Sequence, residues 1–154
     1  KYSHMGIIYK IDNDFFVFEA VQPVKLTYMK SWIKRGENSH YVIKRLKNAD
    51  EILTKEALSK LKKIGESFKG KSYDIYFEWS DEKIYCSELV WKMYKEAINI
   101  EIGKLQNLSE FDLENKIVRN KLSERYGNDI PLMEKVISPG SMFNSNLLYT
   151  VETK

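Results

Sequence analysis

The fold is decided by the stretch Tyr85-Cys86-Ser87-Glu88-Leu89-Val90-Trp91-Lys92-Met93-Tyr94, which contains the only cysteine of the chain. From Cys86 to Ile98, apolar side chains recur at the i, i+3, i+4, i+7 spacing of one helical face, which predicts an amphipathic helix beginning at the cysteine. A thiol in the first turn lies beside backbone N–H groups without intrahelical partners and at the positive end of the helix dipole. Both features favour the thiolate, which is the nucleophilic form of cysteine.

The composition predicts one globular domain over residues 1–154 and gives little sign of its partners. Hydrophobic residues are 43% and charged residues 31% of the chain, as in ordinary globular proteins. The formal net charge of +3 permits attraction to anionic surfaces, but no nucleic-acid motif accompanies it. A single cysteine excludes an internal disulfide, and no apolar run approaches the ~18 residues of a membrane span. No targeting signal is visible, so the compartment stays open, with the cytoplasm favoured.

The N-terminal residues predict a β-hairpin. Residues 3–10 and 15–21 have the apolar, β-branched and aromatic content of strands. Between them lies the turn signal Asp12-Asn13-Asp14. A short loop centred on this turn would pair Lys10 with Phe15, which fixes the register of the two strands.

This register brings a histidine to a carboxylate. Gly6 faces Glu19, so His4 and Glu19 lie diagonally on the same face of the hairpin. The absence of a side chain at Gly6 leaves room for Glu19 to lean toward His4. A lone carboxylate in so apolar a strand needs a partner, because an unpaired buried charge costs several kcal/mol. We therefore expect His4 to be that partner.

Further elements follow along the chain. In order, they are a short helical piece capped by Thr27 and ended by Gly36, a strand over 40–46, a helix capped by Thr54 and ended by Gly70, an extended aromatic segment over 73–79, polar helices within 109–126, a short helix around Met133 and a closing strand over 147–151. The expected apolar face of the helix after Thr54 is Ala57, Leu58, Leu61, Ile64 and Phe68.

Cys86, His4 and Glu19 are the residue types that nucleophilic acyl transfer requires. Cysteine attacks a carbonyl carbon, imidazole takes and returns the proton, and a third polar group fixes the imidazole tautomer. From the pattern alone, Cys86 is equally well a core residue of its helix, and a lone histidine in a strand is more often structural. A zinc site built from these residues and His40 has permitted ligand types, but no close ligand pair supports it.

Four separate motifs, in order along the chain, resemble the YiiX-like branch of the permuted NlpC/P60, papain-like cysteine peptidases. They are Ser3-His4-Met5-Gly6-Ile7, Phe18-Glu19-Ala20-Val21, Tyr85 to Trp91, and Ile137-Ser138-Pro139-Gly140-Ser141-Met142-Phe143-Asn144-Ser145. The resemblance implies an α+β, circularly permuted papain-like fold, with an antiparallel sheet packed against the helix that carries the cysteine. The sequence lacks the Gly-Asp strand usually found upstream of the family's histidine, which leaves open whether the N-terminal part of the domain is missing.

The resemblance also implies roles for individual residues. By position, Cys86 matches the nucleophile, His4 the catalytic histidine and Glu19 the third polar residue, while Tyr85 matches a tyrosine that often lines the site. The implied activity is that of a cysteine hydrolase, which cleaves an amide bond of a peptide or amino-acid conjugate through an acyl-cysteine. An acyltransferase or thioesterase acting on lipids or esters shares the same core, and a non-catalytic ligand-binding module is a further alternative.

The remaining candidates are weaker. Tyr73 and Trp79, with their aromatic neighbours, either line an apolar substrate pocket or belong to the core. The lysine cluster at positions 60, 62, 63, 69 and 71 is either a solvated face or an anionic-ligand surface. We expect a peptide, amino-acid-conjugate or acyl-amide substrate, with no nucleic acid, no transmembrane segment, no metal and no cofactor. The oligomeric state stays open.

Overall fold

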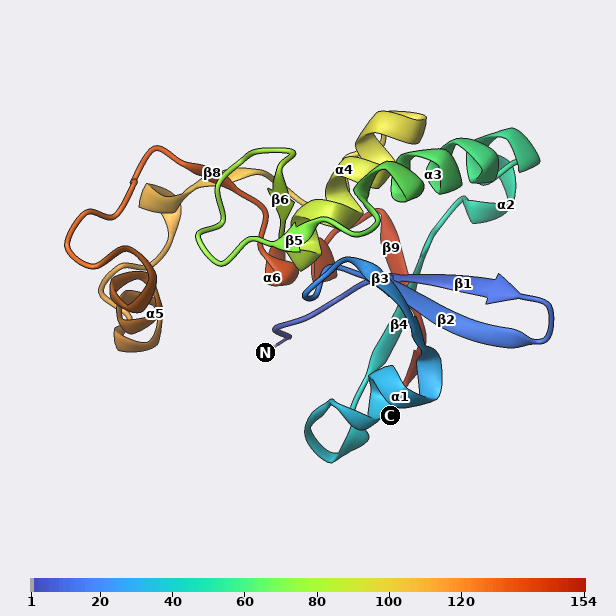
Figure 1. Cartoon of the computed structure of the whole chain (residues 1–154), viewed down its shortest axis with the longest axis horizontal. Coiled ribbons are helices and arrows are strands. Elements are labelled where there is room, and N and C mark those ends of the chain that lie inside the picture. Colours follow the sequence, from blue (N-terminus) through green and yellow to red (C-terminus); the bar gives the residue numbers. More distant parts are fainter. Residues whose placement is uncertain (1) are drawn as a thin grey trace.

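A small antiparallel sheet packs against two neighbouring helices (Figure 1). The computed structural model describes residues 2–154, without the side chains of residues 117 and 121. The sheet has the order β1 (Ile7–Ile11), β2 (Asp14–Glu19), β3 (Lys25–Tyr28), and the helices are α3 (Lys55–Phe68) and α4 (Cys86–Ile98). The main core between them contains Phe18, Leu61, Phe68, Leu89 and Met93. This arrangement confirms the predicted α+β fold with the sheet against the cysteine helix.

The hairpin has the predicted register. Lys10 pairs with Phe15, and the ladder ends where Ile7 pairs with Phe18, so residues 3–6 continue as a strap rather than as the strand expected there. A Cβ at Gly6 would lie 2.5 Å from the carbonyl oxygen of Phe18 and 3.2 Å from Cβ of Glu19. Only glycine permits the strap to approach β2 this closely.

Helix α4 begins at Cys86 and ends at Ile98, as the periodicity predicts. Tyr85 is its N-cap residue, and the buried carboxylate of Glu88 accepts a hydrogen bond from the Tyr85 backbone N–H at 3.3 Å. Asn99 ends the helix in the left-handed conformation at φ 56°. The contact between Tyr85 and Glu88 therefore fixes the start of the helix at Cys86.

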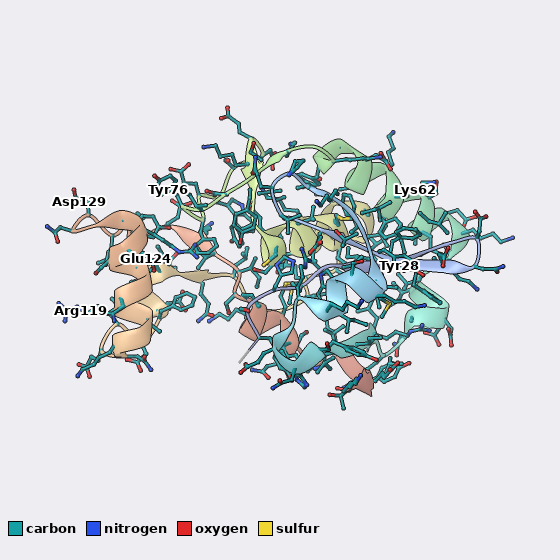
Figure 2. The ribbon with its side chains drawn as sticks, turned by 60° about the horizontal axis from the view of Figure 1, so that its bottom comes forward. Tyr28, Lys62, Tyr76, Arg119, Glu124 and Asp129 are labelled. Carbon is teal, nitrogen blue, oxygen red and sulfur yellow. The ribbon has the colours of Figure 1, made fainter. Side chains whose placement is uncertain are left out.

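Helix α3 begins at the predicted cap, because the Thr54 hydroxyl accepts a hydrogen bond from the Ala57 N–H at 3.2 Å. The expectation that Leu58 is buried is wrong, since this side chain is 51% exposed. Helix α3 approaches α4 closely at Gly65, where a Cβ would lie 2.9 Å from Cε of Met93. The buried line therefore runs through positions 57, 61, 65 and 68, and Leu58 falls beside it. Lys62 lies at the outer edge of this helix (Figure 2).

Thr27 does not cap a helix. It lies in β3, which the sequence pattern missed, and helix α1 (Met29–Lys34) begins two residues later and is followed by Gly36. Proximity to β2 explains the difference, because β3 pairs with β2 over its whole length. A four-residue strand is too short for its alternation to be distinguished from a helix start.

The remaining elements are short. They are η1 (Glu37–Ser39), β4 (Val42–Leu46), α2 (Ala49–Ile52), β5 (Ser72–Tyr73), β6 (Lys83–Ile84), β7 (Gln106–Asn107), η2 (Leu108–Glu110), α5 (Lys116–Tyr126), β8 (Lys135–Val136), α6 (Pro139–Phe143) and β9 (Leu148–Thr153). The predicted closing strand is β9, which pairs antiparallel with β4. None of the helices in the described part of the chain is long and apolar enough to cross a membrane.

The C-terminal third departs most from expectation. Met133 lies in an exposed turn rather than in a helix. The helix of this region is α6, where Ser138 caps and Pro139 occupies the first turn, the combination that starts helices. Helix α5 stands apart from the main body beside residues 75–77 (Figures 1 and 2). Arg125 at its end donates to the carbonyl oxygen of Ile75 at 3.0 Å and lies 3.7 Å from the centre of the Phe77 ring.

Candidate active site

The thiol of Cys86 lies where the cysteine helix meets the N-terminal strap. Cys86 is the first residue of α4 and is only 3% exposed. Its sulfur lies 4.0 Å from the carbonyl oxygen of Ser3, next to His4 in the chain. Because it is at the first helical position, the backbone N–H of Cys86 has no acceptor within the helix and is free to serve a ligand.

His4 and Glu19 form the pair that the hairpin register predicts. His4 Nε2 lies 2.6 Å from Glu19 Oε2. The hydroxyl of Thr27 donates to Oε1 at 2.5 Å, and a terminal nitrogen of Arg35 donates to Oε2 at 2.5 Å. These donors explain how the chain buries the carboxylate of Glu19 completely, because a buried charge must be paired and hydrogen-bonded.

The same contacts set the charges of the site. Burial would lower the pKa of His4, but its hydrogen bonds with Cys86 and Glu19 and their charges raise that pKa to about 9. Burial would likewise raise the pKa of Glu19, but hydrogen bonds from His4, Thr27 and Arg35 lower it to about 2. Near neutral pH, His4 is therefore an imidazolium and Glu19 a carboxylate. Since Nε2 bonds to Glu19, Nδ1 is the ring nitrogen left for the sulfur.

The three residues that the sequence predicts for substrate binding lie in different surroundings. The pKa of the half-buried Tyr73 is raised by burial and by the charge of Cys86, so the hydroxyl keeps its proton. Tyr85 is buried, and its hydroxyl accepts a hydrogen bond from the Ile137 N–H at 3.1 Å. Of these two tyrosines, Tyr85 therefore has its hydroxyl engaged by the backbone, and Tyr73 is the candidate for contact with a ligand at the thiol.

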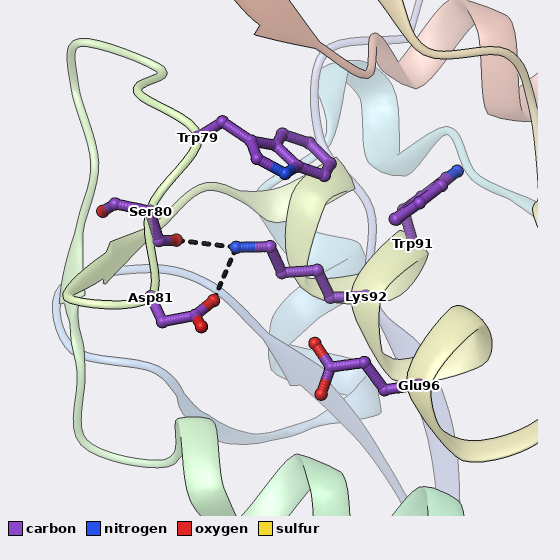
Figure 3. A pocket seen from close by; sticks show the side chains of 6 residues that line it. All are labelled: Trp79, Ser80, Asp81, Trp91, Lys92 and Glu96. Carbon is purple, nitrogen blue, oxygen red and sulfur yellow. Dashed lines mark hydrogen bonds and ion pairs between the residues drawn. The ribbon is translucent and has the colours of Figure 1, made fainter.

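Trp79 lies in the loop between β5 and β6 and lines a pocket of about 290 Å³ beside α4 (Figure 3). Its ring meets Trp91 edge to face at 5.4 Å. The amine of Lys92 lies over Trp79 and donates to the carbonyl oxygen of Ser80 and to Asp81, both at 2.7 Å. Cys86 does not line this pocket, so Trp79 belongs to a neighbouring surface rather than to the thiol.

Sequence reasoning missed two residues of the site, Thr27 and Arg35. Both donate to Glu19, and Arg35 follows the last residue of α1. The available signal was Glu19 itself, because a carboxylate in an apolar strand requires several donors. A buried carboxylate indicates that donors exist but does not identify them. The contacts of Thr27 and Arg35 with Glu19 depend on how β3 and α1 fold back over β2.

The other candidate ligands stay apart from this cluster. His40 Nε2 lies 3.5 Å from the Tyr2 hydroxyl, and the two rings stack at 5.9 Å. Among the residues that the structure describes, no group of three or more histidine, cysteine, aspartate or glutamate side chains is placed to hold a metal ion. The lysines on α3 are exposed, and Lys69 pairs with Glu66 at 3.6 Å.

A cysteine at the start of a helix, beside a histidine from the strap that leads into an earlier sheet, has the arrangement of a papain-like site in permuted chain order. The chain belongs to the family of permuted papain-like amidases, YaeF/YiiX (C92), which it matches over residues 1–152. It is 45% identical to the uncharacterised protein YiiX of Escherichia coli K12 over 150 residues, which is 97% of this chain and 73% of that protein.

The structural comparison agrees with the family. The chain superposes on a crystal structure of YiiX from Escherichia coli O157:H7, described there as a metalloprotein, with a TM-score of 0.92 and 44% identity. The match covers 99% of this chain and 83% of that one. The predicted fold and family are thereby confirmed, and the family supports a cysteine hydrolase of the amidase type.

Proposed function

We propose that this protein is a cysteine amidase that cleaves an amide bond of a peptide or amino-acid conjugate through an acyl-cysteine intermediate. The observation that carries the proposal is the position of His4, whose imidazole lies 2.6 Å from the buried carboxylate of Glu19 and whose chain neighbour Ser3 contacts the sulfur of Cys86 at 4.0 Å. The charge of Cys86 is among the causes that raise the pKa of His4. Membership of an amidase family supports the same chemistry.

The first half-reaction forms the acyl-enzyme. The Cys86 thiolate attacks the carbonyl carbon, and the electron pair of the C=O bond moves to oxygen. We assign the stabilisation of that oxyanion to the backbone N–H of Cys86, at the first position of α4, and to the hydroxyl of Tyr73. The His4 imidazolium then donates its proton to the leaving nitrogen as the C–N bond breaks, which releases the amine and leaves a thioester on Cys86.

The second half-reaction restores the enzyme. Neutral His4 takes a proton from water as the oxygen attacks the thioester, and the C–S bond breaks to release the acid and the thiolate. Glu19 stabilises the imidazolium that exists before and after each turn and keeps the ring oriented. Attack by an alcohol or amine in place of water would give acyl transfer from the same intermediate.

The description of the E. coli relative as a metalloprotein raises the question of a metal here. The residues described in this chain do not fit a resident ion, because they include no cluster of three suitable ligands. His4 Nε2 and both oxygens of Glu19 are already engaged by protein groups. The chemistry is therefore assigned to groups of this chain and to the attacking water.

Alkylation by iodoacetamide tests the proposal without a known substrate, because Cys86 is the only thiol. Near pH 6, Cys86 should react far faster than free cysteine, and His4→Ala should remove the excess. Equal rates for the wild type and free cysteine would refute a catalytic thiol and favour a ligand-binding module.

Turnover of a library of aminoacyl and peptidyl amides gives the second test. Cys86→Ala should abolish hydrolysis while leaving the fold intact, and Glu19→Gln should reduce it less. Tyr73→Phe should lower kcat by roughly 10-fold to 10³-fold if its hydroxyl binds the oxyanion. Hydrolysis by Cys86→Ala at the wild-type rate would contradict the assignment.

A further inference from the structure

One oxygen of Glu19 accepts hydrogen bonds from two cations. Oε2 lies 2.6 Å from His4 Nε2 and 2.5 Å from a terminal nitrogen of Arg35, while Thr27 occupies Oε1. The negative charge that stabilises the imidazolium is therefore shared with a guanidinium that has no direct part in the chemistry.

Helix α1 covers the His4–Glu19 pair from one side. Trp32 and Arg35 lie three positions apart and so share one face of this helix. The Trp32 ring is centred 6.2 Å from the His4 ring, and its buried Nε1 has no hydrogen-bond partner within the described part of the chain. The indole shields one side of the pair from water, although the His4 side chain keeps 30% of its surface exposed.

We propose that Arg35 is a positioning residue that limits how strongly His4 holds its proton, by sharing the Oε2 oxygen of Glu19 with the imidazole. The proposal extends the proposed function, because a general acid that holds its proton too tightly delivers it poorly to a leaving amine. Arg35 acts through Glu19, to which its guanidinium donates at 2.5 Å.

The charged and titratable groups around the pair agree with this role. His4 faces Cys86 and Glu19, and Tyr73 reaches the thiol from β5. Glu19 faces His4 and Arg35, and its neighbour across the sheet is the exposed Lys25. The partial exposure of Arg35, at 47% of its side chain, permits its replacement without opening the core.

A titration of His4 by NMR tests the proposal directly. The chain has only two histidines, so selectively labelled imidazole gives two ring resonances, and a His40→Gln variant assigns them. Arg35→Met should raise the pKa of His4 by roughly half a unit to one unit above its wild-type value, because Glu19 then serves His4 alone. The matched control is Lys34→Met, which removes an equal charge from the preceding residue and should leave the titration unchanged.

The Glu19→Gln background separates the proposed route from direct repulsion between two cations. With the carboxylate removed, Arg35→Met should shift the His4 titration by less than half as much as in the wild type. An unchanged titration in Arg35→Met, an equal shift in Lys34→Met, or an undiminished shift in the Glu19→Gln background would each overturn the proposal. None of these titrations needs turnover. Slow alkylation of Cys86 would therefore refute the proposed function without deciding whether Arg35 affects the titration of His4.

Discussion

The His4 cluster should make the stability of the fold depend on pH in a defined window. Cys86 and Glu19 raise the pKa of His4 from an ordinary 6.5 to about 9, although burial opposes the charge. Because the folded state binds the proton more tightly than the unfolded chain, the stabilisation is fully present below pH 6.5. It is lost as the pH rises through about 9.

The size of the effect follows from the shift. A rise from 6.5 to about 9 corresponds to about 3 kcal/mol, since one unit is about 1.4 kcal/mol. The side chain of His4 is 30% exposed, so solvent weakens the interaction, and we expect about 2 kcal/mol in practice. That is a large share of the 5–15 kcal/mol by which small domains are typically stable.

Urea unfolding of the wild type and of His4→Gln between pH 5.5 and 9.5 measures this contribution. Subtracting the two free energies of unfolding removes the titration of shared groups that do not interact with His4, and leaves that of His4 together with its partners Cys86 and Glu19. The advantage of the wild type should fall by about 2 kcal/mol across this range. His40→Gln is the matched control, because His40 lies outside the Glu19 cluster.

A difference between wild type and His4→Gln that stays flat from pH 5.5 to 9.5 would refute this account of the His4 cluster. A difference that grows as the pH rises would contradict it as well, since it would mean that the folded state favours neutral His4. A window of the same size in His40→Gln would show that the effect does not arise at the cluster.

Three further predictions concern packing around the site. Gly6→Ala should destabilise the fold by about 1–3 kcal/mol in urea and slow the alkylation of Cys86, because the new Cβ would lie 2.5 Å from the Phe18 carbonyl oxygen; wild-type values for both would contradict the close approach. Lys92→Met should lower the free energy of unfolding by about 3–5 kcal/mol, because it removes the amine that lies 2.8 Å from the buried carboxylate of Glu88. Adding Glu88→Gln to this variant should recover part of the lost stability. Leu61→Ala should cost about 2–5 kcal/mol, whereas Leu58→Ala should change the stability by less than about 1 kcal/mol; equal losses would place both leucines in the core.

Several elements and one contact of the site are predictable from the sequence. The starts of α3 and α4 were predicted because caps and periodicity are local signals, and the hairpin register followed from one turn. The contact between His4 and Glu19 followed from that register together with the need of a buried charge for a partner. Each of these steps depends on residues that are close in the chain or on one face of a hairpin.

The donors from Thr27 and Arg35 could not be predicted in the same way. They reach Glu19 only after β3 has paired with β2 and α1 has turned back over the sheet. No periodicity records that return, and an arginine at the end of a short helix looks like an ordinary surface residue. The exposure of Leu58 has a related cause. Helix α3 meets α4 at Gly65, and this contact decides which side chains of α3 are buried, whereas the sequence shows only that Leu58 belongs to an apolar stripe.

A solitary thiol with so little exposed surface has a practical use. Alkylating reagents of increasing size, compared on the wild-type protein alone, would measure how wide the entrance to the thiol is. No second cysteine contributes to the signal. The reagent size above which labelling is lost would give the width of that entrance, and hence the largest acyl group to include in a substrate screen.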